Sequence, residues 1–215
     1  MAAGLIVSGD RRYSVVFAHD QVQGKGRLGR TWVSERGQSL TMSLIFWEYA
    51  NWPKPWLIGM SVALAASHLL DSNVRWPNDL TYGVRKTGGL LSEIHTDPAG
   101  SRIPVVGIGV NLLQGSFPEE LPNAVSVLQA KGQVLDPSAT AAALIEKIIQ
   151  MPEPGDWSDL EPDWRRRDVT AGKFYKLADG REATAVKVTS DGALLCEVDG
   201  VEMKVMAAEA LFGES

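Results

Sequence analysis

Residues 21–32, Gln-Val-Gln-Gly-Lys-Gly-Arg-Leu-Gly-Arg-Thr-Trp, combine the residue types that could hold an anionic ligand. Glycines expose backbone amides, cations supply positive charge and the last residue supplies a flat ring. Ordering several glycines costs conformational entropy, so we expect a loop that is mobile when empty and folds over a phosphorylated ligand. The residues concerned are Gln21, Gly24, Lys25, Gly26, Arg27, Gly29, Arg30 and Trp32.

Other interpretations of this loop are weaker. Its glycines match G-x-G-x-x-G, with Glu48 near the place of a ribose-binding acid, but residues 39–47 alternate like a strand where a dinucleotide fold needs a helix. The G-x-x-x-x-G-K-[ST] pattern of a Walker loop is absent from the sequence. An RGG-like nucleic-acid segment is disfavoured because the motif is single and the chain is acidic. A plain basic surface turn stays open if the loop is judged alone.

The second informative stretch is residues 74–80, Val-Arg-Trp-Pro-Asn-Asp-Leu. Pro77 favours an extended conformation at Trp76, and Asn78 and Asp79 are then expected at a turn after a strand. This could be a common turn in which the Asn and Asp side chains bond their own backbone. The functional alternative is an amide oxygen and a carboxylate that orient a magnesium-bound phosphate or an incoming amine.

Lys86 precedes a glycine pair at the start of a strand expected over residues 90–95. Gly88 and Gly89 would let a ligand touch the backbone, and Lys86 is a natural cation for a carboxylate or phosphate.

A central strand is expected over residues 103–112, with Gly107, Gly109 and Asn111 on one face. The glycines would open a slot beside that face, although close packing of a helix on the sheet would explain them equally well.

Composition narrows the class of protein. The chain has 215 residues, of which 45% are hydrophobic and 22% charged, as in ordinary globular proteins. A net charge of −5 argues against a general nucleic-acid binder. Cys196 is the only cysteine, which fits a reducing compartment. The sequence has no apolar run of membrane-spanning length and its start does not resemble a signal peptide, so we expect a cytoplasmic protein.

The order of elements predicts two domains. Strands are expected at residues 13–18, 39–47, 90–95 and 103–112, and helices at 56–70, 136–150 and 157–167. Beyond residue 168, short β runs at 173–177, 182–189, 193–198 and 202–205 are separated by Asp-Gly pairs typical of hairpin turns. We expect a catalytic domain over residues 1–167 and a small β domain, suited to docking a partner, over residues 168–215.

Four ordered motifs resemble those of biotin protein ligases. They are Gln21-x-x-Gly-Lys-Gly-Arg-x-Gly-Arg-x-Trp32, Arg75-Trp-Pro-Asn-Asp79, Lys86-x-Gly-Gly-x-x-x-Glu93 and Gly107-Ile-Gly-Val-Asn111. The resemblance extends from about Ser8 to the C-terminal β runs. It implies an α+β fold with a mixed sheet flanked by helices, similar to class II aminoacyl-tRNA synthetases, plus a C-terminal SH3-like β-barrel.

The resemblance also implies a reaction. Biotin and MgATP would give biotinyl-5′-AMP, and a lysine of a biotin carboxyl carrier domain would then displace AMP. Arg27, Lys86 and Asp79 would be the catalytic residues, with Asp79 orienting the acceptor lysine. The biotin-binding residues would be Gln21, Gly24, Lys25, Arg27, Lys86, Gly89 and Gly107. The nucleotide-binding residues would be Arg27, Arg30, Trp32, Asn78, Lys86 and Asn111, with Asn78 near magnesium through the phosphates.

One departure from the family pattern bears on activity. Relatives carry a Ser-Thr-Asn segment before the first strand, and neither Ser8 nor Ser14 matches it. We expect either a truncated or misassigned start, or altered biotin binding. The sequence has no DNA-binding helix-turn-helix domain, so neither transcriptional regulation nor a nucleic-acid partner is expected. A lipoate or octanoate ligase and a non-catalytic binding protein are the alternatives, and a homodimer is possible.

Overall fold

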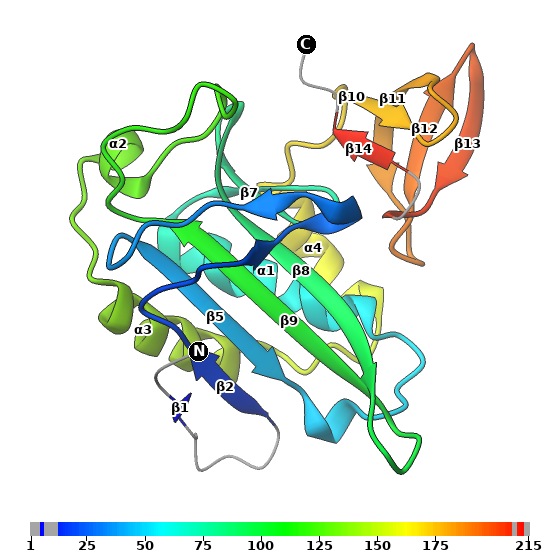
Figure 1. The fold of residues 1–215 in the computed structure, drawn as a ribbon. Coiled ribbons are helices and arrows are strands. Elements are labelled where there is room, and N and C mark those ends of the chain that lie inside the picture. Colours follow the sequence, from blue (N-terminus) through cyan, green and yellow to red (C-terminus); the bar gives the residue numbers. More distant parts are fainter. Residues whose placement is uncertain (1–4, 7–12, 208–209, 213–215) are drawn as a thin grey trace.

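The protein is built on two β-sheets, one large and one small (Figure 1). The computed structural model describes residues 5–6, 13–207 and 210–212. The residues on which the Ser-Thr-Asn expectation depends lie largely outside this part, because residues 1–4 and 7–12 are not described.

Seven strands form the large sheet. In their order across the sheet they are β1 (Leu5–Ile6), β2 (Ser14–Phe17), β5 (Ser39–Ile45), β9 (Arg102–Asn111), β8 (Arg85–Thr96), β7 (Asp79–Tyr82) and β6 (Asn73–Arg75). All pairings between these strands are antiparallel, so the expectation of a mixed sheet was wrong in this respect. The reason is that β6 to β9 follow one another through short turns, whereas parallel neighbours need a long crossover connection.

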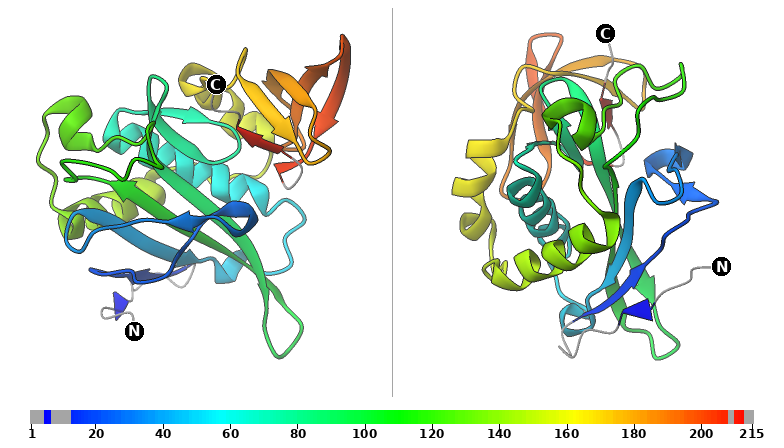
Figure 2. Two further views of the ribbon diagram at one scale, coloured as in Figure 1. Left: turned by 45° about the horizontal axis from the view of Figure 1, so that its top comes forward. Right: turned by 90° about the vertical axis from the view of Figure 1, so that its left-hand side faces the viewer.

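Helices cover one face of this sheet (Figure 2). The main ones are α1 (Trp56–Leu70), α3 (Pro137–Gln150) and α4 (Trp157–Arg167), and α2 (Val127–Lys131) is short. Helix α1 is buried along most of its length because its small residues let it approach the strands closely. Asp136 caps the start of α3 and Asp156 that of α4, as each side chain accepts a hydrogen bond from a backbone N–H of its helix. In the described part of the chain, none of the helices has the length and hydrophobicity to cross a bilayer.

The C-terminal segment forms a separate five-stranded antiparallel sheet. Its order is β13 (Val201–Val205), β12 (Leu194–Val198), β11 (Glu182–Val188), β10 (Phe174–Leu177) and β14 (Ala210–Phe212). Gly180, Gly192 and Gly200 have positive φ at the turns, as the Asp-Gly pairs predicted. The α+β class with a small C-terminal β unit is thereby confirmed, whereas the division at residues 167 and 168 stays a prediction.

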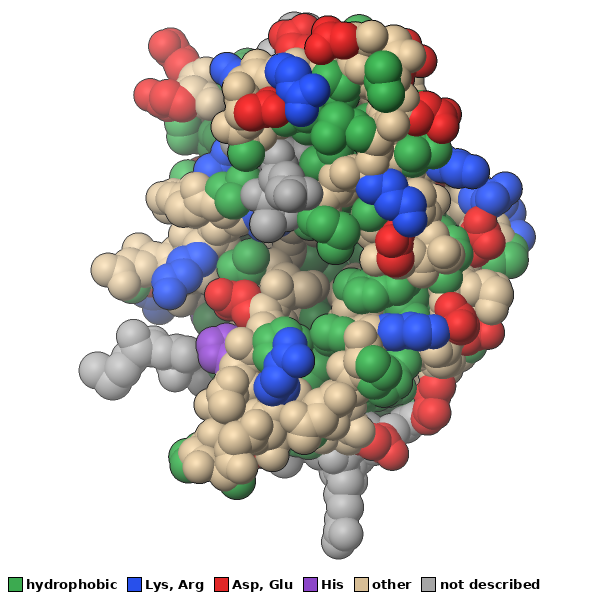
Figure 3. Space-filling model, turned by 90° about the vertical axis from the view of Figure 1, so that its right-hand side faces the viewer, with side chains coloured by type: hydrophobic (Ala, Val, Ile, Leu, Met, Phe, Trp, Pro, Cys, Tyr) green, Lys and Arg blue, Asp and Glu red, His purple; other side chains and the backbone are tan. Residues whose placement is uncertain are grey.

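Short elements make up the rest of the described chain. They are β3 (Gly24–Lys25), β4 (Thr31–Trp32) and the 3-10 turns η1 (Arg27–Gly29) and η2 (Trp47–Tyr49). On the face drawn in Figure 3, Lys and Arg side chains are interspersed with Asp and Glu rather than gathered into one patch. By sequence, the basic loop of residues 21–32 is a local feature of a chain with a net charge of −5.

Candidate active site

The site lies on the face of the large sheet that the helices leave open. Gly107 and Gly109 of β9 point to this face, and Gly109 pairs with Gly89 of the neighbouring strand β8. A Cβ added at Gly107 would have its nearest neighbour 3.7 Å away, at the carbonyl oxygen of Leu91. The missing side chains therefore leave room beside the strands, as expected from the sequence.

Trp32 covers part of this glycine surface. A Cβ added at Gly109 would come within 2.5 Å of the Trp32 indole, so the ring lies directly on the Gly109 backbone. The ring is brought there by a small hairpin in which Gly24 pairs with Trp32 and Lys25 with Thr31. Among the described residues the buried indole N–H has no hydrogen-bond partner. The glycine loop thus reaches across the open face of the sheet (Figure 2).

Next to Trp32 is a buried carboxylate held by two cations. Asp79 is only 7% exposed, and its Oδ1 lies 2.5 Å from Lys86 Nζ. Its Oδ2 lies 2.8 Å from a guanidinium nitrogen of Arg75, the residue directly opposite in the β6–β7 hairpin. Burial alone would raise the pKa of Asp79, but Lys86 and Arg75 lower it below its usual value. Asp79 is therefore ionised at neutral pH.

Arg27 approaches the same group from the glycine loop. Burial lowers the pKa of its guanidinium, and attraction to Asp79 opposes this effect. Lys86 also lies 5.9 Å from the centre of the Trp32 ring, in the range of a cation–π contact. Arg27, Trp32, Asp79 and Lys86, which come from separate sequence motifs, are thus brought together in space. Gly89 belongs to this group, because a Cβ there would lie 3.2 Å from Lys86 Nζ.

The two asparagines lie at the border of the site. The side-chain amide of Asn78 donates to the carbonyl of Leu90, which fixes it beside Asp79. Asn111 is buried, and its side chain contacts Gln114 at 3.4 Å and the Val125 carbonyl at 3.5 Å. The structure therefore ties the Asn111 amide into the surrounding backbone rather than into the charged group.

Besides Asn111, three polar residues that were expected at the site lie on the exposed part of the glycine loop. Gln21, Lys25 and Arg30 are exposed on the glycine loop. Arg75 was named from the sequence only as part of a motif, and its role was not predicted. Its pairing with Asp79 follows from the tight β6–β7 hairpin, which was expected to be a turn after a single strand.

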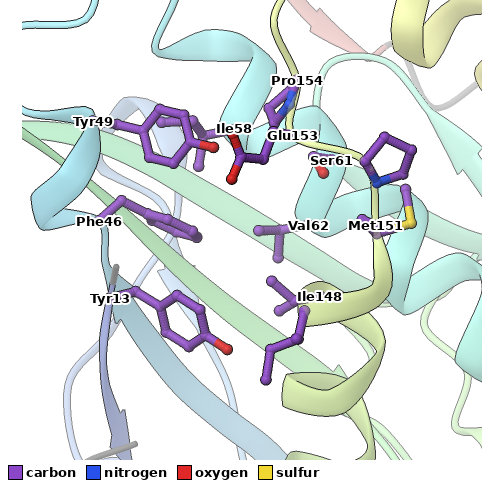
Figure 4. Close-up of a pocket in the computed structure, with 12 residues that line it drawn as sticks. Tyr13, Phe46, Tyr49, Ile58, Ser61, Val62, Ile148, Met151, Glu153 and Pro154 are labelled. Carbon is purple, nitrogen blue, oxygen red and sulfur yellow. The ribbon is translucent and has the colours of Figure 1, made fainter. Parts of the chain in front are cut away.

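An apolar hollow lies elsewhere on the molecule (Figure 4). Tyr13, Phe46 and Tyr49 line one side of it, and Val62 of α1 and Ile148 of α3 line the other. These helices cover the opposite face of the sheet from Gly107 and Gly109. The hollow contains none of the motif residues, so the candidate site is defined by the charged group instead.

Comparison with known proteins identifies the family. Residues 7–111 match the Biotin/lipoate A/B protein ligase family. The "Bifunctional ligase/repressor BirA" of Escherichia coli is 30% identical over 96% of this chain and 67% of its own length. The chain belongs to the biotin protein ligase family. The solved "Biotin protein ligase from Aquifex aeolicus in complex with biotin and ATP" has the same fold as this chain, with a TM-score of 0.73. The two are 22% identical, and the match covers 94% of this chain and 89% of that one.

The family members differ in length. The BirA protein of Bacillus spizizenii is 33% identical over 63% of this chain but only 43% of its own length. This member of the biotin protein ligase family therefore spans between about two fifths and two thirds of the length of these curated relatives.

Proposed function

We propose that this protein is an ATP-dependent biotin ligase. It would form biotinyl-5′-AMP and then transfer biotin to a lysine of a biotin carboxyl carrier domain. The observation that supports this is the convergence of Arg27 and Lys86, from two separate motifs, on one buried carboxylate at the glycine surface. Membership of the family and the solved relative with bound biotin and ATP support the choice of substrates.

The first step joins two anions. A biotin carboxylate oxygen attacks the α-phosphorus of ATP, the bond to the bridging oxygen breaks, and pyrophosphate leaves. Cations must reduce the repulsion between carboxylate and phosphate and stabilise the charge that develops in the transition state. Arg27 and Lys86 are assigned to this role, because Lys86 lies beside Gly89 and Arg27 is close enough to Asp79 to interact with it electrostatically.

The second step needs a carboxylate for the incoming amine. The carrier lysine attacks the acyl carbon, the bond to the AMP oxygen breaks, and the nitrogen gives up a proton. In the structure Lys86 occupies Oδ1 of Asp79 while Arg75 holds Oδ2. We infer that the adenylate draws Lys86 away, which frees Oδ1 to orient the acceptor amine while Arg75 keeps the carboxylate in place.

The nucleotide would lie toward Trp32. Its indole is assigned to stacking on adenine, with Arg30, Asn78 and Asn111 near the phosphates and ribose. Among the residues that the structure describes, no cluster of three or more His, Cys, Asp or Glu side chains could hold a metal ion. Magnesium that stays on the triphosphate and keeps several waters needs no such cluster. Asn78 would then touch it only through the phosphates.

Biotin would lie along the glycine surface. Gly89 and Gly107 leave space there, and the loop residues Gln21, Gly24 and Lys25 would close over the ligand. Gly24 has no room for a side chain, since an added Cβ would clash with the backbone carbonyl oxygen of Trp32. The exposed positions of Gln21 and Lys25 suit a loop that folds down on binding. A homodimer and a cytoplasmic location stay predictions.

Ligand-dependent pyrophosphate exchange tests the proposal. Exchange of labelled pyrophosphate into ATP that requires biotin is the expected result. Exchange with lipoate or octanoate instead would identify the related ligase, and exchange with none of these acids would identify a binding protein without catalysis. Biotinylation of a purified carrier domain then tests the second step separately.

A further inference from the structure

Trp76 connects the candidate active site to the C-terminal sheet. It is 1% exposed and is the first residue of the turn 76–78, which leads into Asp79 of β7. Its backbone N–H donates to Thr170 Oγ1 at 2.8 Å, and its carbonyl accepts from the Tyr175 hydroxyl at 2.6 Å. Its indole N–H donates to the carbonyl of Gly192 at 3.0 Å. All three partners come from beyond residue 168.

These contacts are buried, and further contacts hold the partner residues in place. Thr170 and Tyr175 are each 0% exposed, and the Tyr175 ring packs edge-on against Trp76 with centroids 5.6 Å apart. Thr170 in turn donates two hydrogen bonds to the Asp168 carboxylate, one from its hydroxyl and one, of 2.9 Å, from its backbone N–H. Burial makes each of these hydrogen bonds costly to lose, because water cannot replace the missing partner.

The network is also close to the charged group. Arg75 and Asp79 both act electrostatically on the Tyr175 hydroxyl, and Tyr175 acts on Arg27. Arg75 and Asp79 flank the 76–78 turn and face each other across it. A shift of the Trp76 backbone would therefore change the separation of Arg75 and Asp79, and with it the place of the carboxylate that Lys86 contacts.

We propose that Tyr175 and Thr170 are positioning residues for the ligase reaction. They act through the two backbone groups of Trp76 and fix the turn that carries Asn78 and Asp79. The C-terminal sheet is then part of the catalytic apparatus, in addition to any role in docking a partner. The inference rests on the proposed ligase function for its kinetic consequence, but the mechanical coupling can be measured without it.

Removing the Tyr175 hydroxyl is the first test. Tyr175→Phe keeps the ring and leaves the Trp76 carbonyl without its donor. We expect kcat for biotin-dependent pyrophosphate exchange and for carrier biotinylation to fall about tenfold. KM for biotin should change less than kcat, because Gly107, along which biotin is proposed to lie, belongs to β9 and not to the β6–β7 hairpin that contains Trp76. A variant that is merely less stable would show normal kcat wherever it is folded.

Two further variants serve as controls. The Tyr82 hydroxyl donates to the Leu70 carbonyl at 2.6 Å, so Tyr82→Phe removes a similar bond outside the network, and its kcat should match the wild type. Thr170→Val removes the acceptor for the Trp76 N–H and should lower kcat, while Thr170→Ser keeps a hydroxyl and should restore it. Thermal melts establish the temperature range in which each variant is folded.

Amide hydrogen exchange gives a readout that does not depend on activity. Peptides that contain residues 75–81 should exchange faster in Tyr175→Phe and Thr170→Val than in the wild type, and no faster in Tyr82→Phe. Unchanged exchange in this segment, or wild-type kcat in both folded variants, would overturn the coupling. If the wild type itself shows no biotin-dependent activity, the ligase proposal fails while the exchange data still decide whether the C-terminal sheet holds the turn.

Discussion

The ammonium of Lys86 lies 2.5 Å from Oδ1 of Asp79, and Arg75 holds the other oxygen of the same carboxylate. Lys86 is partly exposed, at 38% of its side chain, whereas Arg75 is buried at 4%. The two cations are therefore not equivalent. Lys86 can exchange Asp79 for an anionic ligand, while Arg75 is fixed by its surroundings.

Lys86→Ala should slow adenylate formation severely. Loss of one preorganised charge at a developing anion lowers kcat by about 100- to 1,000-fold in comparable sites. Biotin-dependent pyrophosphate exchange measures the step directly. Lys54→Ala is the control, because Lys54 pairs with Asp156 at 2.8 Å on the surface and should leave exchange unchanged. A near-normal rate in Lys86→Ala would remove this residue from the mechanism.

Arg75→Met should mainly destabilise the fold. It leaves Asp79 buried with one cation instead of two, and breaking a buried pair in this way costs about 3 kcal/mol. Urea denaturation would show the loss as a lower free energy of unfolding. The comparison variant is Arg166→Met, whose ion pair with Asp163 at 3.2 Å involves an arginine side chain that is 70% exposed. That surface pair contributes about 1 kcal/mol or less, so equal effects in the two variants would contradict the assigned role of Arg75.

The acid sensitivity of the fold should depend on Asp79. Burial opposes ionisation, but Lys86 and Arg75 hold the pKa of Asp79 below its unfolded-state value of about 3.9. The ionised carboxylate therefore contributes stability that is fully present above the unfolded-state pKa and is lost as the pH falls through the lower folded-state pKa. Free energies of unfolding for wild type and Asp79→Asn should differ most near neutral pH and converge in strong acid. A difference that grows on acidification would show that the sign of the pKa shift is wrong.

The elements with a strong local pattern could be predicted from the sequence. The helix Trp56–Leu70, predicted from its apolar spacing, and the short helix Trp157–Arg167 both have their predicted bounds, and the Asp-Gly pairs located the C-terminal turns. Strand β7 was missed because its first residue, Asp79, also suits a turn. The role of Tyr175 could not be read from the sequence, since 99 residues separate it from Trp76 and no local rule links them.

For the candidate site, the sequence predicted the residues but not how they come together. The motifs identified Arg27, Asp79 and Lys86 separately, and chemistry suggested that cations should meet an anion. Their common position depends on the register of β7, β8 and β9 and on the path of the glycine loop, which are set by tertiary packing. The same packing placed the Trp32 ring on Gly109, whereas the sequence predicted only that the glycines open a slot beside this face.

The close packing of the Trp32 ring on Gly109 should make this position intolerant of a side chain. Gly109→Ala should force the indole away or strain the sheet, at a cost of about 1–3 kcal/mol in the free energy of unfolding. Gly107→Ala is the matched variant, since an added Cβ at Gly107, on the same face and strand, has its nearest neighbour 3.7 Å away. Its stability should be close to that of the wild type. Urea denaturation measures both, and equal stability of the two variants would show that Trp32 does not rest on Gly109 in solution.

Protection of the glycine loop should report ligand binding. Lys25, Arg27 and Arg30 are potential trypsin sites on residues 21–32, and Lys25 and Arg30 are exposed. Ordering of this loop over biotin and ATP would remove the local unfolding that proteolysis requires. We expect cleavage between residues 25 and 30 to slow when both ligands are added, while cleavage at Arg166, on the surface elsewhere, continues at the same rate. Equal slowing at every site would indicate general stabilisation by the ligands, and unchanged cleavage in the loop would exclude closure over the adenylate.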